Sequence, residues 1–153
     1  LTNGLVSVSA ADGGSVAILG VMAGCEYIDL NGKPRFDNNY PATASLKSGT
    51  EATVFVYDDP FQVFELQCDA TLTNLATATA LIHSNAEGAG FGTEHANGIS
   101  SGELSVASAG ATTATDNFRI IGFKDNADID FTSAGVVALV KLNLPFHLDT
   151  TGL

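Results

Sequence analysis

The chain contains no tryptophan, and only 6 of its 153 residues are lysine or arginine. Against these stand 17 aspartate and glutamate residues, so the net charge is -11 at neutral pH. A surface of that sign repels phosphate groups, and we therefore expect no nucleic-acid partner. An anionic membrane surface is disfavoured as a partner for the same reason.

Long apolar runs are also missing. The longest one, residues 16–25, is interrupted by two glycines and is too short to cross a bilayer, which takes about 20 residues. No basic segment precedes an apolar run, so the sequence predicts no secretory signal. Hydrophobic residues make up 45% of the chain and charged residues only 15%, a balance that argues against intrinsic disorder and favours one domain with its own core.

There are only two cysteines, Cys25 and Cys68. Their spacing matches no zinc or redox motif, and a small disulfide scaffold would carry more cysteines. We expect two buried free thiols in a protein made in a reducing compartment, with one disulfide as the alternative.

The apolar residues that are present alternate mostly with a period of two, as in β-strands. Asn31-Gly32 stands between two such runs, and this dipeptide is typical of a hairpin because both residues tolerate positive φ. We expect residues 25–29 to pair with residues 34–36 across it. Gly20 and Gly24, inside the first run, predict bulges or bends.

Other segments continue the β pattern. Strands are expected in residues 5–8, 15–29, 51–57, 61–69, 102–108, 117–123 and 135–144. Residues 51–57 and 61–69 are predicted to form a second hairpin around Asp58-Asp59-Pro60. Residues 72–82 have apolar side chains at helical spacing but many threonines, which indicates a short helix or a turn. Residues 84–98 are predicted to form a long loop.

Short strands with glycine-rich turns are typical of an all-β fold. The sequence therefore predicts a single-domain antiparallel β-barrel or β-sandwich with long loops and at most one short helix. Residues 1–144 are expected to form the β-rich core, and residues 145–153 an irregular C-terminal tail.

One string could carry chemistry. Residues 98–102 spell G-x-S-x-G, the motif around the nucleophile of many hydrolases, and acidic residues and His147 follow Ser100 in the order that such enzymes use. However, the motif requires a strand before the serine and a helix after it, whereas a glycine-rich loop precedes Ser100 and a predicted strand follows. We interpret this segment as a turn.

The other polar groups match known kinds of site no better than Ser100 does. Asn126, Asp128 and Asp130 alternate like Ca²⁺ ligands, but Phe131 replaces the glycine that a calcium loop needs. The remaining candidates lack catalytic or ligand spacing: the pair Asp58-Asp59, the histidines His83, His95 and His147, and the glycine-rich residues 88–92. We therefore predict no catalytic residue, no cofactor and no metal site, and a protein that is not an enzyme.

Three segments together are more specific. The first is the strand GVMAGCEY at residues 20–27, the second is PRF followed by NYPA at residues 34–42, and the third is the run VFVYDDPFQVFELQ at residues 54–67. Together they resemble a family of small virion structural proteins of tailed bacteriophages. Residues 112–115 (TTAT) and 118–123 (FRIIGF) also fit this resemblance.

The resemblance implies a capsid decoration, or cement, protein on the exterior of the phage head, made in the host cytoplasm. Its implied partners are the major capsid protein and further copies of itself, with a trimer favoured, and it implies no catalytic residues. We expect the contacts to come from residues 37–49, 84–98 and 145–153, because loops and tails carried by a rigid scaffold often bind partners.

Three other functions remain as alternatives. The chain could belong to a tail, neck or fibre of the virion, although long fibres usually show repeats and this chain shows none. It could be a carbohydrate- or receptor-binding β module, against which the absence of tryptophan counts. The third alternative is a hydrolase that uses Ser100 and His147.

Overall fold

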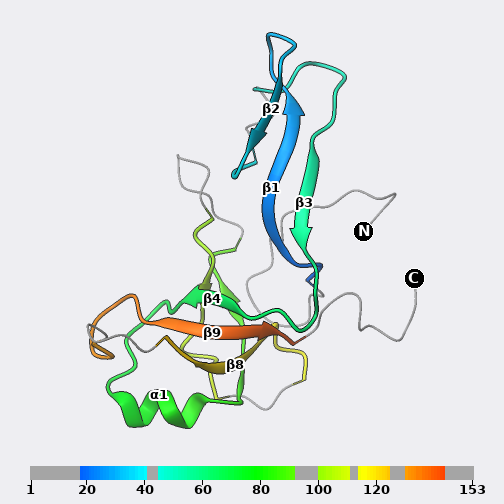
Figure 1. The fold of residues 1–153 in the computed structure, drawn as a ribbon. Helices are drawn as coiled ribbons and strands as arrows, with labels where there is room; N and C mark the ends of the chain where they lie inside the picture. The colour runs from blue at the N-terminus through cyan, green and yellow to red at the C-terminus, as the bar shows by residue number, and fades with distance from the viewer. Residues whose placement is uncertain (1–17, 41–44, 92–99, 111–113, 125–129, 144–153) are drawn as a thin grey trace.

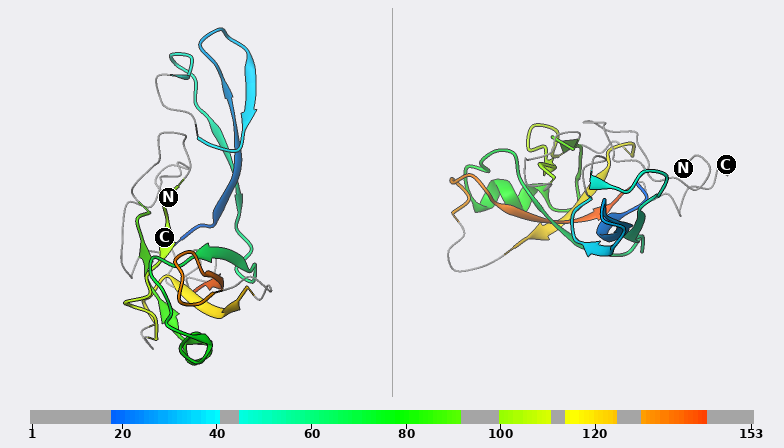
Figure 2. Two further views of the ribbon diagram at one scale, coloured as in Figure 1. Left: turned by 90° about the vertical axis from the view of Figure 1, so that its left-hand side faces the viewer. Right: turned by 90° about the horizontal axis from the view of Figure 1, so that it is seen from above.

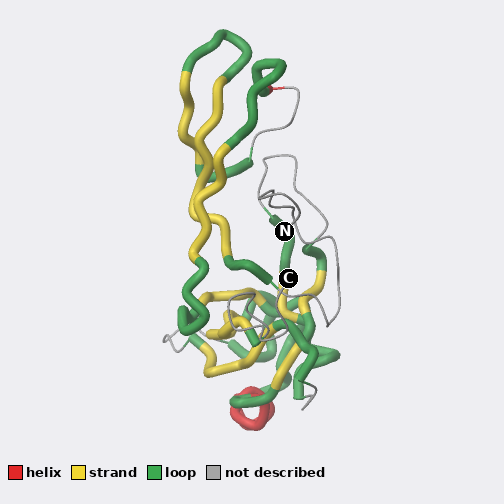
Figure 3. Tube along the Cα trace, turned by 90° about the vertical axis from the view of Figure 1, so that its right-hand side faces the viewer, coloured by secondary structure: helices red, strands yellow, loops and turns green. Residues whose placement is uncertain are grey.

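A computed structural model describes residues 18–40, 45–91, 100–110, 114–124 and 130–143 of the chain. These residues form a compact body and an arm that projects from it (Figure 1). The two side views, the left panel of Figure 2 and Figure 3, show the same division, with the arm standing away from the body sheet.

The arm is a three-stranded antiparallel sheet. Its strands are β1 (Val21–Ile28), β2 (Pro34–Asp37) and β3 (Thr53–Tyr57), in the order β2-β1-β3. The predicted hairpin between residues 25–29 and 34–36 is confirmed, with Glu26 opposite Phe36 and Ile28 opposite Pro34. A register shift between Met22 and Gly24 confirms a bulge in the glycine-containing run.

The body is built on a four-stranded antiparallel sheet in the order β4-β9-β8-β5, next to a two-stranded sheet of β6 and β7. The bounds of these strands are β4 (Phe64–Gln67), β5 (Asn85–Ala86), β6 (Gly88–Ala89), β7 (Glu103–Leu104), β8 (Phe118–Phe123) and β9 (Val137–Leu142). β9 alternates between half-buried and buried residues, as expected for a strand with one face on a core.

One short helix, α1 (Leu75–Leu81), confirms the helical alternative for residues 72–82. The side chain of Asn74 caps it by accepting a hydrogen bond from the Thr77 backbone N–H at 2.9 Å. The threonines do not prevent this turn of helix, because Ala78 is buried in the body core and tertiary packing outweighs propensity.

The hydrophobic core lies in the body. Its fully buried members include Leu72, Leu104, Ile120 and Val140, which come from a loop and from three different strands. Of the buried apolar residues in the described chain, Cys25 is the one that lies in the arm. The arm therefore has no core of its own. It is held together by the hydrogen bonds between its strands and by the contacts around the buried Cys25.

The all-β, antiparallel prediction is confirmed, but the described sheets do not close into a barrel. The predicted hairpin between residues 51–57 and 61–69 is wrong. β3 pairs with β1, and β4 pairs with β9. The reason is the turn between them, where the Asp59 carboxylate accepts the Phe61 backbone N–H at 2.8 Å and redirects the chain from the arm into the body.

Two further expectations are corrected. Residues 84–98 are not a loop throughout, because β5 and β6 lie in their first part and residues 92–99 fall outside the described chain. The strand expected at 102–108 is limited to Glu103–Leu104. Beyond it, the Ala109 N–H bonds back to Ser105 and Val106, so the chain turns. The expected strand at residues 5–8 and tail at 145–153 also lie outside the described residues.

Candidate interaction surface

The tip of the arm is organised by one carboxylate. Asp29 accepts hydrogen bonds from the backbone N–H groups of Asn31 and Lys33, both at 2.9 Å, and from the Arg35 Nε at 3.0 Å. These hydrogen bonds lower the pKa of Asp29 below its ordinary value, and the bond from the Lys33 backbone N–H has the largest effect. Gly32 takes the positive φ of 78° that the turn requires.

One face of the arm sheet is partly covered by the chain itself. Cys25 is fully buried there, and its S–H donates to the backbone oxygen of Asn39 at 3.2 Å. On the same face, the Tyr27 hydroxyl donates to the Asp37 carboxylate, and Val54 is half-buried opposite Cys25. Burial is the main cause that raises the pKa of the Cys25 thiol.

The opposite face of the arm is exposed and carries several apolar side chains around the exposed Glu26. Cross-strand partners share a face, so the pairings of Glu26 with Phe36 and of Gly24 with Phe55 place both rings on it. We call this surface the aromatic face. Its apolar members are Val21, Ile28, Phe36, Phe55 and Tyr57.

Its rings are well exposed to solvent. Phe36 is 62% exposed, Tyr57 is 60% exposed and Phe55 is 43% exposed. Of the eleven large hydrophobic residues that are exposed in the described chain, ten lie between Val21 and Val63, in the arm or in the turn that joins it to β4. Single exposed apolar side chains are ordinary on a protein surface, but five of these residues share the aromatic face, and such a cluster indicates an interaction site.

Gly24 makes the aromatic face possible. A Cβ atom built at this position would lie 3.0 Å from the Phe36 Cζ and 3.2 Å from the Asp37 backbone oxygen. Because the position is bare, the Phe36 ring can lie over the middle strand. Its centroid is 5.8 Å from that of Phe55, with the two rings tilted by 41°.

Ser100 is placed in a turn. Its Oγ accepts the backbone N–H of Gly102 at 3.1 Å, and β7 follows where a nucleophile motif would require a helix. The expected partner His147 lies outside the described residues, as does His95. The structure therefore does not bring a Ser-His pair together in its described part.

The carboxylate candidates serve local turns. Asp59 caps the turn after β3, and Asp130 accepts the Thr132 backbone N–H at 2.9 Å. Hydrogen bonds from Thr132 and then from Ser133 lower the pKa of Asp130. Asn126 and Asp128 lie outside the described residues, and no group of three or more His, Cys, Asp or Glu in the described chain is arranged to hold a metal ion.

The glycine-rich residues 88–92 have a packing role. A Cβ on Gly88 would come within 2.3 Å of the Phe91 ring, and one on Gly102 would come within 2.8 Å of it. Phe91 lies between these two glycines and stacks on Phe118 with centroids 5.6 Å apart. These glycines therefore admit an aromatic side chain to the edge of the core, and the described part of the stretch forms a strand and a turn.

No sequence motif pointed to Asp116, a carboxylate that is buried in the body. Asp116 is only 4% exposed, and its Oδ2 has no hydrogen-bond partner in the described structure. Burial, followed by the charge of Glu87, raises its pKa above the ordinary aspartate value. Its backbone oxygen accepts a hydrogen bond from the Asn143 side chain at 3.0 Å.

Both cysteines are free and buried, as expected. The aromatic face was not predicted as a site. Part of the signal was present, since alternation puts Phe55 and Tyr57 on one side of their strand, but the predicted hairpin set no register, and the structure is what places Phe36 opposite Glu26. What was missing was the pairing of β3 with β1, which joins these residues into one surface.

Comparisons with known proteins give no further guide. No family model, no curated protein and no solved structure matches the chain. Within the described residues, α1 is the only helix, and its seven residues are far too few to traverse a lipid bilayer.

Proposed function

We propose that this chain is a non-enzymatic structural protein of a tailed-phage virion, and specifically a capsid decoration protein that binds the outer surface of the major capsid protein lattice. The observation that carries the proposal is the position of the motifs behind the family resemblance. Residues 20–27, 34–36 and 54–57 make up nearly all of the arm, and the rest of the third motif forms the turn into β4. The segments that define the resemblance are thus the ones that build the exposed aromatic face.

The charge distribution supports an exterior position. Residues 18–57 carry three of the 6 basic and four of the 17 acidic residues, which leaves a net charge of -10 out of -11 on the remainder of the chain. A chain with this net charge is repelled by packaged DNA and is compatible with the outside of a shell. A ligand that binds only the mature lattice stabilises it by mass action, and weak contacts suffice when they repeat over many sites.

The test is the copy number of this chain in purified virions. Particles of the source phage are separated on a density gradient, and this chain is quantified against the major capsid protein by mass spectrometry. A ratio near that of the coat protein supports decoration. A dozen copies or fewer per particle would assign the chain to the neck or tail, and absence from particles would overturn the virion role.

A carbohydrate- or receptor-binding module is the second candidate, and one observation favours it. Phe36, Phe55 and Tyr57 form an exposed aromatic surface on a rigid sheet, and sugars stack on such rings. Binding of the purified chain to a glycan array, with loss of binding in Tyr57→Ser, would support this candidate. The candidate fails if the chain binds no glycan while its virion copy number is high.

A further inference from the structure

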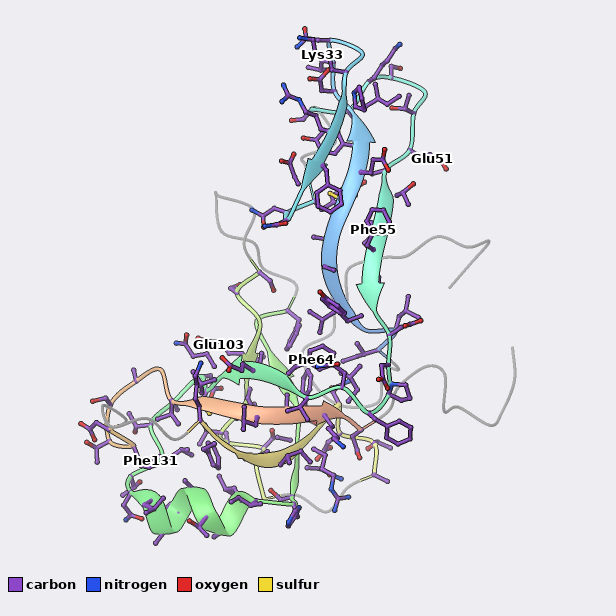
Figure 4. The ribbon with its side chains drawn as sticks, viewed as in Figure 1. Lys33, Glu51, Phe55, Phe64, Glu103 and Phe131 are labelled. Atoms are coloured by element: carbon purple, nitrogen blue, oxygen red, sulfur yellow. The ribbon has the colours of Figure 1, made fainter. Side chains whose placement is uncertain are left out.

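We propose that Asn31 is a site of spontaneous deamidation, with the backbone nitrogen of Gly32 as the attacking group and water as the co-reactant, and that Asp29 holds this reaction in check. The proposal follows from the turn at the tip of the arm and does not depend on the virion role. Asn31 and Gly32 are both exposed, so water reaches the turn. Figure 4 shows the neighbouring Lys33 at the far end of the arm.

The reaction requires an asparagine whose following residue does not crowd its side chain. Asparagine is thermolabile because the backbone nitrogen of the next residue can attack its side-chain amide. Glycine has no Cβ atom to block this approach. Asn31-Gly32 is one of three Asn-Gly pairs in the sequence, the others being Asn3-Gly4 and Asn97-Gly98. It is the pair that lies among the described residues, so its surroundings are known.

Water is the one co-reactant that the chemistry needs. The Gly32 nitrogen gives up its proton and forms a bond to the Asn31 Cγ. The bond between Cγ and the side-chain amide nitrogen breaks, and ammonia leaves with that proton. Water then opens the resulting cyclic imide. Attack of water at Cγ gives aspartate, whereas attack at the main-chain carbonyl carbon gives isoaspartate, in which the backbone continues through the side chain.

The closed turn withholds the attacking nitrogen. Three consecutive backbone N–H groups donate to Asp29. Those of Asn31 and Lys33 bind its Oδ1, and that of Gly32 binds its backbone oxygen, all at 2.9 Å. The Gly32 nitrogen therefore keeps its proton while the turn is closed, and its hydrogen bond must break before it can act as the nucleophile.

The Asp29 carboxylate is what holds this turn closed. Its Oδ2 accepts the Arg35 Nε at 3.0 Å, and its side chain is only 13% exposed. Hydrogen bonds to a carboxylate are stronger than those between neutral groups. Deamidation at Asn31 therefore requires a local opening of the tip, and its rate is proportional to the fraction of molecules in which the tip is open.

The products of the reaction act on the same turn. The imide has no hydrogen on the Gly32 nitrogen, so the bond to the Asp29 backbone oxygen cannot form again. Isoaspartate adds one atom to the backbone between β1 and β2, and the register of a hairpin depends on the length of its turn. Aspartate keeps the backbone unchanged but places a second carboxylate beside Asp29. Isoaspartate at position 31 therefore loosens the arm more than aspartate does.

The first test measures the rate of deamidation in the purified full chain, at mildly alkaline pH, in buffer and in concentrated guanidinium chloride. Peptide mass spectrometry follows each asparagine with time. In guanidinium, Asn3, Asn31 and Asn97 should react at similar rates, because each is followed by glycine in an unfolded chain. In buffer, Asn31 should react about tenfold more slowly than in guanidinium, or slower still, because the turn must open first. Equal rates at Asn31 in the two solvents, or no reaction there in guanidinium, would overturn the proposal.

The second test removes the carboxylate. Asp29→Ala takes away the acceptor of the Asn31 and Lys33 N–H groups, and it should accelerate deamidation of Asn31 in buffer about tenfold, towards the rate in guanidinium. The matched control is Glu51→Ala, which removes an exposed carboxylate of the arm that takes no part in the hydrogen bonds of the turn. This control should react at the wild-type rate.

Folding of the arm is verified in each variant by the protection of Cys25 from a thiol reagent. Where Asp29→Ala exposes Cys25, Asp29→Asn takes its place, because an amide keeps one acceptor oxygen but carries no charge. Asp29→Asn should then react faster at Asn31 than Glu51→Gln does. A wild-type rate of deamidation in a folded Asp29 variant would overturn the role of Asp29.

The third test examines the products. A chain that carries Asn3→Gln and Asn97→Gln is aged until Asn31 has reacted, and the isoaspartate form is separated by ion-exchange chromatography. Its Cys25 should react with a thiol reagent faster than Cys25 of the Asn31→Asp variant, which has the new charge but an ordinary backbone. Equal Cys25 reactivity in the two forms would overturn the effect of isoaspartate on the arm.

Discussion

Phe36 and Phe55, on the two outer strands of the arm, meet over Gly24 of the strand between them, with their ring centroids 5.8 Å apart. The contact joins strands that are not hydrogen-bonded to each other. It depends on the one position in β1 where a side chain would collide with the Phe36 ring. The stability of the arm and the shape of its exposed face are therefore linked through a single glycine.

Gly24→Val tests this link. Its new side chain must displace the Phe36 ring or bend β1, and overpacking of this kind costs about 1–3 kcal/mol. Because the effect is confined to the arm, the reaction of Cys25 with a thiol reagent should accelerate about tenfold or more, as expected from 1.4 kcal/mol per factor of ten. The body should keep its unfolding midpoint.

The matched control is Gly122→Val in β8. A Cβ at Gly122 has no neighbour within 4 Å, and valine is well suited to a strand. We expect little change in Cys25 reactivity from this variant. Equal effects of the two substitutions would show that loss of glycine itself, and not the contact with Phe36, controls the arm.

The two thiols should report on different parts of the molecule. Burial, with the charges of Asp69 and Glu103, raises the pKa of Cys68 to about 11, so roughly one molecule in a thousand carries the thiolate at pH 8. Cys25 also has a raised pKa, but the short segment around Asn39 is what covers it. We expect both to react slowly in the native protein and Cys25 to react first, because the arm opens without unfolding the body.

Labelling followed by peptide mass spectrometry checks this order, with Cys25→Ser and Cys68→Ser used to assign the two phases. Reaction of Cys68 before Cys25 would contradict it, and simultaneous reaction would show that arm and body unfold as one unit.

Local signals predicted the strands of this fold better than their partners. The Asn31-Gly32 turn and the alternation around it were sufficient for the β1–β2 hairpin, because both strands lie within one short segment. The pairing of β4 with β9 joins residues 64–67 to residues 137–140, and no local pattern specifies a contact over that separation. The same limit led to the wrong β3–β4 hairpin, since strands adjacent in sequence were expected to pair.

Glycine-rich segments were the other source of error. The stretch at residues 88–92 looks like a loop because glycine disfavours strands, yet Gly88 lies in β6 and makes room for the Phe91 ring. Its role becomes visible only when Gly102, 14 residues later, is known to stand on the other side of that ring. The aromatic face was missed for a related reason, because its residues come from three strands and no one segment of sequence contains it.

Ser100 gives a prediction about chemistry. Its Oγ accepts the Gly102 N–H within a turn, and in the described structure no histidine stands beside it to act as a base. We expect a fluorophosphonate probe to leave Ser100 unlabelled under conditions that label a serine hydrolase to completion. Stoichiometric labelling that is lost in Ser100→Ala would revive the hydrolase alternative.

Asp116 should destabilise the body at neutral pH. Its pKa is raised by burial and by Glu87, so the folded state binds the proton more tightly than the unfolded chain does. Linkage gives the sign of the pH dependence. The contribution of Asp116 to stability is greatest below the ordinary aspartate pKa, and it is lost as the pH rises through the raised pKa of the folded state. The buried carboxylate also keeps its Oδ2 without a hydrogen-bond partner in the described structure.

Asp116→Asn removes the charge with almost no change in shape. We expect the melting temperature at pH 7 to rise by about 2–4 °C, which corresponds to roughly 1 kcal/mol in a domain of this size. The gain should shrink as the pH is lowered, because the raised pKa lets the wild-type group take up a proton in the folded state. Glu51→Gln, the same chemical change at an exposed position of the arm, should leave the melting temperature unchanged at every pH. A loss of stability in Asp116→Asn at pH 7 would mean that the charged carboxylate is itself stabilised in the fold, and that burial does not govern this group.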